Sequence, residues 1–326
     1  MRATRRSVLR GFLSGFVFLF ISQGIALAQY PTRPITVIVP SAPGGTTDVC
    51  ARFLSNLAQK SLGKPIVIEN RAGASHTIGM AEIVNAKPDG YTLGYIPFIA
   101  LTLTPYMVKD SYSYKDFTAI VSTNYYCQGL CVRADAPWKT YREFIEYARK
   151  NPGVIFAHAG RATGTYLILM YIAKEEKVQL KDLPFAGGAP ANTALLGGHV
   201  KALSGAGSHM PFVKEGKFRL LAVYGPERLK SFPDVPTIAE LGHGKLPGNP
   251  SQGFFGPKGI PEEARRLLEK VFEDAVKSKA YAEFLEKIDS ELGYANGADA
   301  EKQLEEHYVK WGRLLKELKE SGLQIN

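Results

Sequence analysis

Apolar residues along the chain alternate between short continuous runs, typical of buried strands, and the spacing of one helix face. Ile35–Val39 is such a run, and Val49, Phe53, Leu54 and Leu57 then fall on one side of a helix. Further runs predict strands at 66–69, 91–96, 129–132, 154–157, 219–223 and 253–257, and further periodic segments predict helices at 80–86, 166–174, 191–196, from 261 onward and at 299–321. Thr140 and Glu143 fit a capping box that opens another helix, which Asn151–Gly153 ends. This alternation predicts an α/β fold with a mostly parallel sheet covered by helices.

The strand–helix pattern divides the chain into two halves, and the second half begins near Cys127. Extended chain at 253–257 is expected to return to the first half. We therefore predict one domain from residues 29–125 and 254–326, and a second from residues 126–253. A small ligand would bind in a cleft between two such domains.

Each half contains a strand-to-helix turn with glycine and threonine. The first is Ser41–Asp48 and the second is His158–Thr165. Glycine lets the backbone approach a ligand closely, and a helix N-terminus offers unpaired N–H groups with partial positive charge. The two turns therefore favour an anion held by hydrogen bonds. The alternative is a plain tight connection in which Thr47 or Asp48 caps the helix.

The N-terminal residues 1–28 predict an export signal. Four arginines in the first ten residues precede an apolar stretch, and Ala26–Ala28 gives a small-x-small cleavage pattern, with cleavage after Ala28. The alternative is a permanent membrane anchor. Thr4–Arg10 is also similar to a twin-arginine motif, so both export routes stay open. We expect the mature protein in the periplasm.

The charge balance argues against a nucleic-acid ligand. The 326-residue chain has a formal charge of +9, and removal of the four N-terminal arginines leaves about +5. The other basic residues are interspersed with acidic ones, without an aromatic-laced basic stripe, so we expect no nucleic-acid partner. A mildly positive protein still favours an anionic ligand.

The sequence offers little catalytic machinery. It contains no phosphate-loop or dinucleotide motif, and Gly73–Thr77 falls one residue short of a nucleophile elbow. The six histidines are not paired at metal-ligand spacing. Cys50, Cys127 and Cys131 fit buried apolar positions. We therefore expect neither a cofactor nor a metal, and no enzymatic activity.

A series of short motifs then carries a family resemblance. In chain order they are Tyr30–Ile35, Ser41–Asp48, Glu69–Ala74, Pro88–Leu93, Tyr114–Phe117, Leu195–Val200 and Pro233–Thr237. The ordered set resembles the tripartite tricarboxylate transporter substrate-binding family, also called the Bug receptors. The resemblance implies a type II periplasmic-binding-protein fold with two α/β domains. Such receptors close on a carboxylate like a Venus flytrap and pass it to a membrane permease; a monomer is expected.

The resemblance also implies the ligand-binding residues. In the family the two turns face each other and hold a carboxylate, partly through water. Carried over, the first turn supplies Ala42, Pro43, Gly44, Gly45, Thr46 and Asp48, and the second half supplies Gly160, Thr163, Gly164, Thr165, Gly187, Gly188, Ala189 and Ser204. Asp48 is expected to organise the turn rather than to touch a carboxylate.

Departures from the family pattern bear on the ligand. Arg161 and Tyr166 stand where the family is serine-rich, and Lys201 and Gly205 replace acidic residues. We predict a ligand with more than one negative group, a dicarboxylate or tricarboxylate, while Tyr166 and Phe98 would admit an aromatic acid. The alternative is that Arg161 and Lys201 face solvent. Two alternative functions stay open. The protein could be the sensor subunit of a membrane signalling protein, or a secreted enzyme on the same scaffold.

Overall fold

The strand–helix alternation builds two mixed β-sheets in the computed structural model, which describes residues 30–320 except 109, 110, 162, 226 and 245–250. The first sheet has the order β11 (Ser290–Asn296), β4 (Phe117–Tyr126), β10 (Ser251–Pro257), β3 (Thr92–Pro97), β1 (Ile35–Val39) and β2 (Ile66–Asn70). The second has the order β7 (Leu180–Pro184), β6 (Val154–His158), β8 (Ala202–Ala206), β5 (Gln128–Arg133) and β9 (Phe218–Val223).

Both sheets are mixed, so the prediction of a mostly parallel sheet is wrong. Strand β1 pairs in parallel with β2 and β3, and β6 pairs in parallel with β7 and β8. In contrast, β10 runs antiparallel to β3 and β4, and β5 runs antiparallel to β8 and β9. The parallel pairs come from βαβ units, whereas β10 returns to the first sheet after the chain has built the second. Parallel neighbours are joined by a crossover connection, usually a helix, and β10 reaches β3 and β4 by no such connection, so it is free to pair antiparallel.

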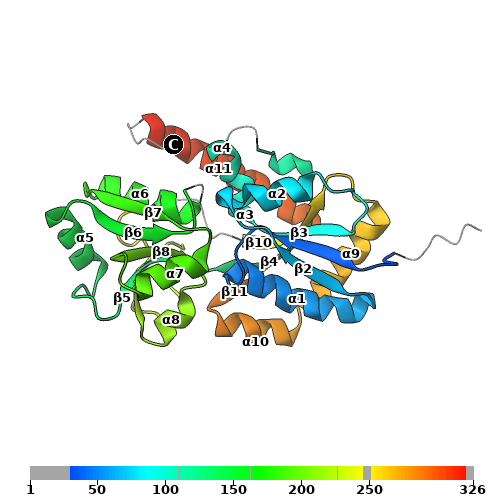
Figure 1. Cartoon of the computed structure of the whole chain (residues 1–326), viewed down its shortest axis with the longest axis horizontal. Helices are drawn as coiled ribbons and strands as arrows, with labels where there is room; N and C mark the ends of the chain where they lie inside the picture. The colour runs from blue at the N-terminus through cyan, green and yellow to red at the C-terminus, as the bar shows by residue number, and fades with distance from the viewer. Residues whose placement is uncertain (1–29, 109–110, 162, 226, 245–250, 321–326) are drawn as a thin grey trace, which may run out of the picture. The chain divides into compact units, whose positions relative to one another are not determined.

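Helices flank each sheet. Figure 1 shows α1, α2 and α9 beside the first sheet, and α5, α6, α7 and α8 beside the second. The helices are α1 (Thr46–Leu62), α2 (Thr77–Val84), α3 (Phe98–Thr102), α4 (Thr104–Met107), α5 (Tyr141–Lys150), α6 (Gly164–Glu175), α7 (Gly188–Leu196), α8 (Met210–Lys214), α9 (Glu262–Val276), α10 (Lys279–Lys287) and α11 (Gly297–Glu320), with 3₁₀ turns η1 (Ala74–His76) and η2 (Tyr114–Asp116).

Local sequence signals set the ends of the main helices. Helix α1 ends where Gly63 adopts the left-handed conformation, with φ of 63°. Thr140 and Glu143 form the predicted capping box at the start of α5: the Thr140 hydroxyl accepts the Glu143 N–H at 3.2 Å, and the Glu143 carboxylate accepts the Thr140 N–H at 3.3 Å. These contacts confirm the capping prediction from the sequence.

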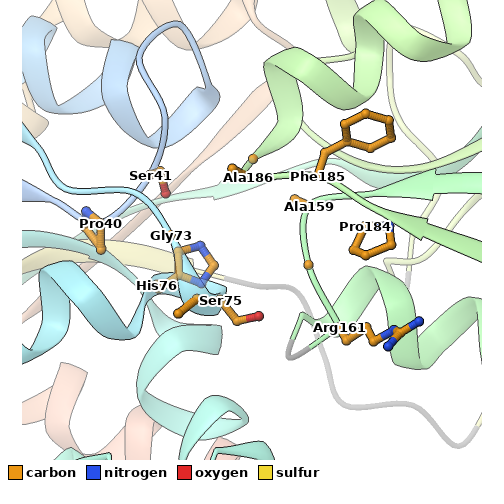
Figure 2. A pocket seen from close by; sticks show the side chains of 13 residues that line it. Pro40, Ser41, Gly73, Ser75, His76, Ala159, Arg161, Pro184, Phe185 and Ala186 are labelled. Atoms are coloured by element: carbon orange, nitrogen blue, oxygen red, sulfur yellow. The ribbon is translucent and has the colours of Figure 1, made fainter. Parts of the chain in front are cut away.

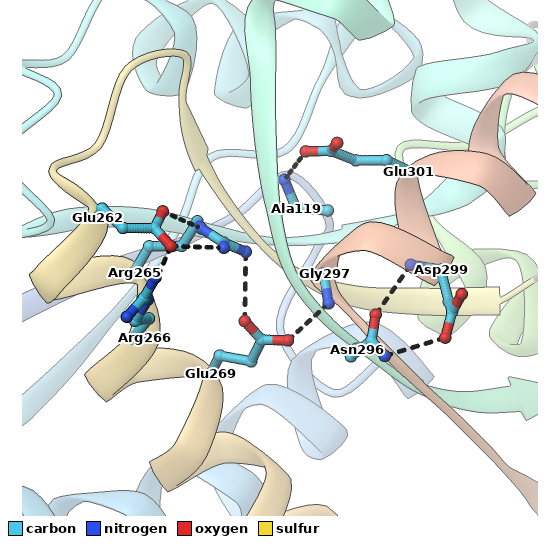
Figure 3. Close-up of polar contacts among 9 residues, drawn as sticks. All are labelled: Ala119, Glu262, Arg265, Arg266, Glu269, Asn296, Gly297, Asp299 and Glu301. Carbon is cyan, nitrogen blue, oxygen red and sulfur yellow. Dashed lines mark hydrogen bonds and ion pairs between the residues drawn. The ribbon is translucent and has the colours of Figure 1, made fainter.

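A polar network fastens the C-terminal segment to the first sheet (Figure 3). Arg265 of α9 bridges Glu262 and Glu269, and Glu269 accepts the Gly297 N–H at 3.0 Å where α11 begins. Glu301 of α11 accepts the backbone N–H of Ala119 in β4 at 3.3 Å. The start of α11 is thus tied both to a neighbouring helix and to a strand.

Helix α11 packs against both cores. Its Leu304 lies in the core cluster of the first sheet with Phe98 and Phe255. Its Trp311 and Leu315 lie in the cluster that includes strands and helices of the second sheet. A helix that contributes to two hydrophobic cores links the packing of the two halves.

Some sequence predictions are only partly covered by the described residues. The export signal at 1–28 lies outside them, and the predicted domain boundaries stay a prediction. Cys50, Cys127 and Cys131 are buried and free. Within the part of the chain that the structure describes, no helix is both long enough and apolar enough to cross a membrane.

Candidate functional site

The first turn, Ser41–Asp48, leads from β1 into α1. Gly44 adopts φ of 79°, and Gly45 occupies the N-cap without a side-chain cap on the helix. Asp48 turns back to accept the Gly44 N–H at 2.9 Å, and it also accepts Asn70 Nδ2 at 2.9 Å and Arg52 Nε at 3.0 Å. Asp48 therefore holds the shape of the turn and leaves the first N–H groups of α1 without an intrahelical partner.

Burial alone would raise the pKa of Asp48. Arg52, the Gly44 N–H and Asn70 lower it, and the net effect is a pKa below the ordinary value. The carboxylate is therefore ionised at neutral pH and stays bound to its three partners. This is the organising role that the sequence predicted for Asp48, and its side chain lines neither of the cavities described below.

The second turn, His158–Thr165, leads from β6 into α6. Gly160 has φ of 125°, and Thr163 occupies the N-cap, where its hydroxyl donates to the Gly160 carbonyl at 2.5 Å. The hydroxyls of Thr163 and Thr165 pair at 3.2 Å. Glycine is favoured at position 160 because side chains rarely adopt this φ and because a Cβ there would lie 3.0 Å from Ser75 Oγ of the first half. The two halves therefore approach each other at this turn.

An inner cavity of about 70 Å³ lies where three helices begin. Its described lining includes no Lys, Arg, Asp or Glu side chain. The lining comes from the N-termini of α1, α6 and α7 and from the segments around them: Ser41, Ala42, Gly45, Thr46, Thr47, His76, Pro97, Ile99, Tyr126, Gln128, Ala159, Thr163, Gly164, Thr165, Gly187, Gly188, Ala206 and Ser208. An anion here would meet N–H groups, hydroxyls and the positive ends of helix dipoles.

An outer cavity of about 370 Å³ adjoins the inner one. Figure 2 shows Pro40, Ser41 and His76 on one side and Ala159 and Ala186 on the other. The remaining lining residues are Gly73, Ala74, Ser75, Gly160, Arg161, Pro184, Phe185 and Gly187. Four residues line both cavities, namely Ser41, His76, Ala159 and Gly187. The two spaces therefore meet at these residues, and a volume of this size accommodates the body of a small ligand.

Most of the predicted binding residues line one of these cavities. The predicted residues that do so are Ala42, Gly45, Thr46, Gly160, Arg161, Thr163, Gly164, Thr165, Gly187 and Gly188. The others are Pro43, Gly44, Asp48, Phe98, Tyr166, Ala189 and Ser204, which line neither cavity. Pro43 and Gly44 are exposed on the turn, and Ala189 lies one residue beyond the glycines that begin α7.

The two aromatic candidates are core residues. Phe98 is 1% exposed and packs edge-on against Phe255. Tyr166 stacks on His158, with 4.8 Å between ring centroids. Ser204 is also buried, where its hydroxyl donates to the Thr165 carbonyl at 2.7 Å and so supports the start of α6. None of these side chains offers a surface to an aromatic acid.

The basic candidates contribute less positive charge to the site than their residue types suggested. Arg161 Nε lies 2.7 Å from Asp182 Oδ2, and Figure 2 shows its guanidinium turned away from His76. Asp182 also lies 3.3 Å from His158 Nε2, and the Gly160 N–H donates to His158 Nδ1 at 3.2 Å. Lys201 is exposed and lines neither cavity. Asp182 therefore neutralises Arg161, which still lines the outer cavity, whereas Lys201 lies outside both cavities.

The loop that carries His76 was not among the predicted binding residues. Ala74, Ser75 and His76 have φ of 42°, 53° and 80°, so three consecutive non-glycine residues are left-handed. The segment had been noted only as an incomplete nucleophile elbow. Tyr126 and Gln128, which lie where the chain passes from the first sheet to the second, were also missed because no local pattern marks a crossing point. Within the described residues, no group of three or more His, Cys, Asp or Glu is placed to hold a metal ion.

Comparison with known proteins places this chain in a family. A sequence model described as "Tripartite tricarboxylate transporter family receptor" matches residues 50–320. The "UPF0065 protein in gbd 5'region" of Cupriavidus necator is 36% identical over 270 residues, which is 82% of each chain.

Two solved structures extend the comparison. The periplasmic binding protein BugD superposes with a TM-score of 0.83 at 27% identity, covering 88% of this chain and 98% of BugD. MatC from Rhodopseudomonas palustris with bound malate gives a TM-score of 0.81 at 28% identity, covering 86% of this chain and 98% of MatC. The chain therefore belongs to the tripartite tricarboxylate transporter receptor family, the Bug receptors, and has the two-domain α/β fold of periplasmic binding proteins.

Proposed function

We propose that this protein captures a small carboxylate between its two halves and delivers it, chemically unchanged, to a membrane permease of the tripartite tricarboxylate type. The observation that carries the proposal is the inner cavity, where the first turns of α1, α6 and α7 meet around a space lined by neutral hydrogen-bond donors. Helix N-termini bind anions through their free N–H groups and dipoles. The malate bound by the relative MatC belongs to the same chemical class.

The dimensions support a carboxylate in the inner cavity and the rest of the ligand in the outer one. A cavity of about 70 Å³ is several times the roughly 10–15 Å³ that one water needs on the same measure, so it has room for a group of at least a few heavy atoms. The adjoining 370 Å³ falls in the range of small-ligand pockets. The anion would be held without a paired cation, so its charge would be balanced by dipoles alone.

Closure around the ligand follows from the contacts between the halves. The Thr46 hydroxyl at the start of α1 donates to the Ala206 carbonyl of β8 at 3.3 Å. A ligand bonded to both turns would stabilise this closed arrangement over an open one, as a hinge mechanism requires. We propose that the receptor acts as an exported monomer in the periplasm and presents the closed form to its permease.

Binding is tested with the full-length sequence, expressed and purified as the cell processes it, against monocarboxylic, dicarboxylic, tricarboxylic and aromatic acids. A ligand that binds only the folded state raises the melting temperature by mass action. Calorimetry then gives Kd, and mass spectrometry of the recovered acid tests whether it is unchanged. If no acid shifts the melting temperature and denatured protein releases none, the proposed function is refuted.

A matched pair of variants places the ligand in the inner cavity. Thr47→Val removes a hydroxyl from its lining at nearly constant volume, and Thr193→Val does the same at an exposed position of α7 that lines neither cavity. We expect Thr47→Val to raise Kd about tenfold, because a hydrogen bond to a charged group contributes about 1.5 kcal/mol or more. Thr193→Val should leave Kd unchanged. Equal effects of the two variants would contradict the assigned site.

Delivery is tested separately, in cells. Uptake of the labelled acid should require both this receptor and the permease, and the receptor should appear in the periplasmic fraction. Uptake that persists in cells lacking the receptor would refute the transport part of the proposal while leaving binding intact.

A further inference from the structure

A buried histidine at the end of β6 bonds to the backbone of the second turn. His158 has no exposed surface, and its ring contacts the rings of Phe156 and Tyr166. Its Nδ1 atom accepts the Gly160 N–H at 3.2 Å. A side chain that accepts the N–H of the residue two positions further on closes a local turn, as asparagine and aspartate do in Asx-turns. His158 therefore restrains the backbone at Gly160, which lines the outer cavity.

Asp182 fixes which ring nitrogen of His158 carries the proton. Because Nδ1 accepts the Gly160 N–H, the proton of the neutral ring lies on Nε2, which is 3.3 Å from Asp182 Oδ2 in β7. Burial alone would raise the pKa of Asp182, but Arg161 and His158 lower it, and the net pKa lies below the ordinary value. An ionised carboxylate only accepts hydrogen bonds, so Asp182 favours the form with the proton on Nε2 and leaves Nδ1 as an acceptor.

The restraint at Gly160 reaches residues that line both cavities, although His158 itself lines neither. Gly160 has φ of 125°, and a residue without Cβ has many alternative conformations, so the hydrogen bonds of its N–H and carbonyl decide its orientation. Its carbonyl accepts the hydroxyl of Thr163, which occupies the N-cap of α6 and lines the inner cavity. A change at His158 would therefore move polar groups of the second turn without any contact between His158 and the ligand.

We infer that His158 is a positioning residue: its neutral ring holds the second turn in the shape that binds the ligand, and protonation of the ring releases the turn. This inference rests on the proposed function. A protonated imidazole carries a hydrogen on both nitrogens, so Nδ1 would present a donor to the Gly160 N–H in place of an acceptor. Two donors repel each other, so Gly160 must move, and the N–H groups and hydroxyls that the turn offers to an anion move with it.

The groups around the ring keep it neutral near pH 7. The titratable and charged groups that face it are Asp182 from β7, Arg161 from the turn and Tyr166 from α6. Burial lowers the pKa of His158 below 6.5, although Asp182 favours the charged form. Burial raises the pKa of Tyr166 above 10, so its hydroxyl stays protonated. Affinity for the ligand should therefore be constant around neutral pH and fall in acid.

Three variants test the positioning role at pH ~7.5, with the Kd of the best-bound acid measured by calorimetry. His158→Leu removes the acceptor, and Kd should rise about tenfold because the turn loses its restraint. His158→Asn can accept the Gly160 N–H in an Asx-turn and should restore Kd to within about threefold of the wild-type value. His199→Asn makes the same change at an exposed histidine that lines neither cavity, and it should leave Kd unchanged. Melting curves show whether each variant is folded.

The pH dependence of Kd separates positioning by the ring from a general loss of packing. NMR of labelled histidine identifies the His158 signal by its loss in His158→Asn, and it reports both the tautomer and the protonation of the ring. About one pH unit below the midpoint of this titration, about a tenth of the rings are neutral, so the wild-type Kd should be about tenfold higher than at pH ~8. The ratio of the wild-type Kd to that of His158→Asn cancels the titration of the ligand and of other groups, and it should show the same rise.

The outcomes separate the inference from the proposed function. If no acid of any class binds, both fail together. If acids bind and folded His158→Leu binds them as tightly as the wild type, the inference alone is overturned. It is overturned equally if His158→Asn binds no better than His158→Leu, or if the ratio of Kd values stays constant while the ring titrates. A ring that remains neutral until the protein unfolds overturns release by protonation.

Discussion

Replacement of Gly207 by alanine should hold the two halves of the receptor apart. Gly207 follows β8 and has φ of 75°, and it lies against Thr46 at the start of α1. A Cβ at Gly207 would lie 2.3 Å from Thr46 Oγ1 and 3.0 Å from both Cβ and Cγ2. Rotation of the threonine about χ1 gives no relief, because a β-branched side chain presents a heavy atom in most rotamers.

The size of the effect follows from these distances. Ordinary contact begins near 3.4 Å, so the halves must separate by about 1 Å. That movement would break the 3.3 Å hydrogen bond from Thr46 to Ala206 and stretch every bond that a ligand makes to one of the two turns. The loss of about two hydrogen bonds to a carboxylate, at about 1.5 kcal/mol each, would weaken binding by about 3 kcal/mol, or roughly 100-fold in Kd.

Gly216→Ala provides the matched control within the second half. Gly216 has φ of 67°, so alanine meets the same backbone penalty of about 1 kcal/mol, but no atom lies within 4 Å of its Cβ. Both variants should therefore lose similar stability in chemical denaturation. Only Gly207→Ala should lose affinity in calorimetry and show a larger radius of gyration with ligand in small-angle scattering. Equal Kd values for the two variants would refute the closure argument.

Three further predictions concern stability, each measured by chemical denaturation. Asp48→Asn should lower the free energy of unfolding by ~2 kcal/mol at pH 7. Because folding lowers the pKa of Asp48, the stability that its carboxylate contributes is present above the unfolded pKa of 3.8 and is lost as the pH falls through the lower folded pKa. Burial lowers the pKa of His209 from 6.5 to about 4, so the unfolded state binds the proton first and the free energy of unfolding falls as the pH drops between these two values. His209→Leu should reduce this loss of stability by up to ~3 kcal/mol. An unchanged dependence of stability on pH in this variant would contradict the reasoning. Lys214→Met should cost ~2 kcal/mol, because Lys214 lies 2.9 Å from the buried carboxylate of Asp289, and a second change, Asp289→Asn, should restore part of the loss.

Sequence patterns anticipated the elements whose signals are local. The turn Ser41–Asp48 and the cap at Thr140 were predicted because glycine, threonine and capping residues act within a few positions of the chain. The antiparallel pairing of β10 was not, since its partners lie more than a hundred residues away. The environment of Arg161 was also missed, because Asp182, which neutralises it, comes from the next strand and has no sequence relation to it.

Neither of the two cations predicted to face the ligand, Arg161 and Lys201, adds a free positive charge to the site. The sequence predicted that two added cations would face the ligand, but Arg161 is paired with Asp182 and Lys201 lies at an exposed position outside both cavities. Apart from the paired Arg161, the polar groups among the described lining residues are N–H groups, hydroxyls, the Gln128 amide and the neutral ring of His76. Such groups cannot discriminate by net charge, so they discriminate by the position of each donor and acceptor. A ligand is then accepted when it satisfies every polar atom it buries, because each buried polar atom left without a partner costs affinity.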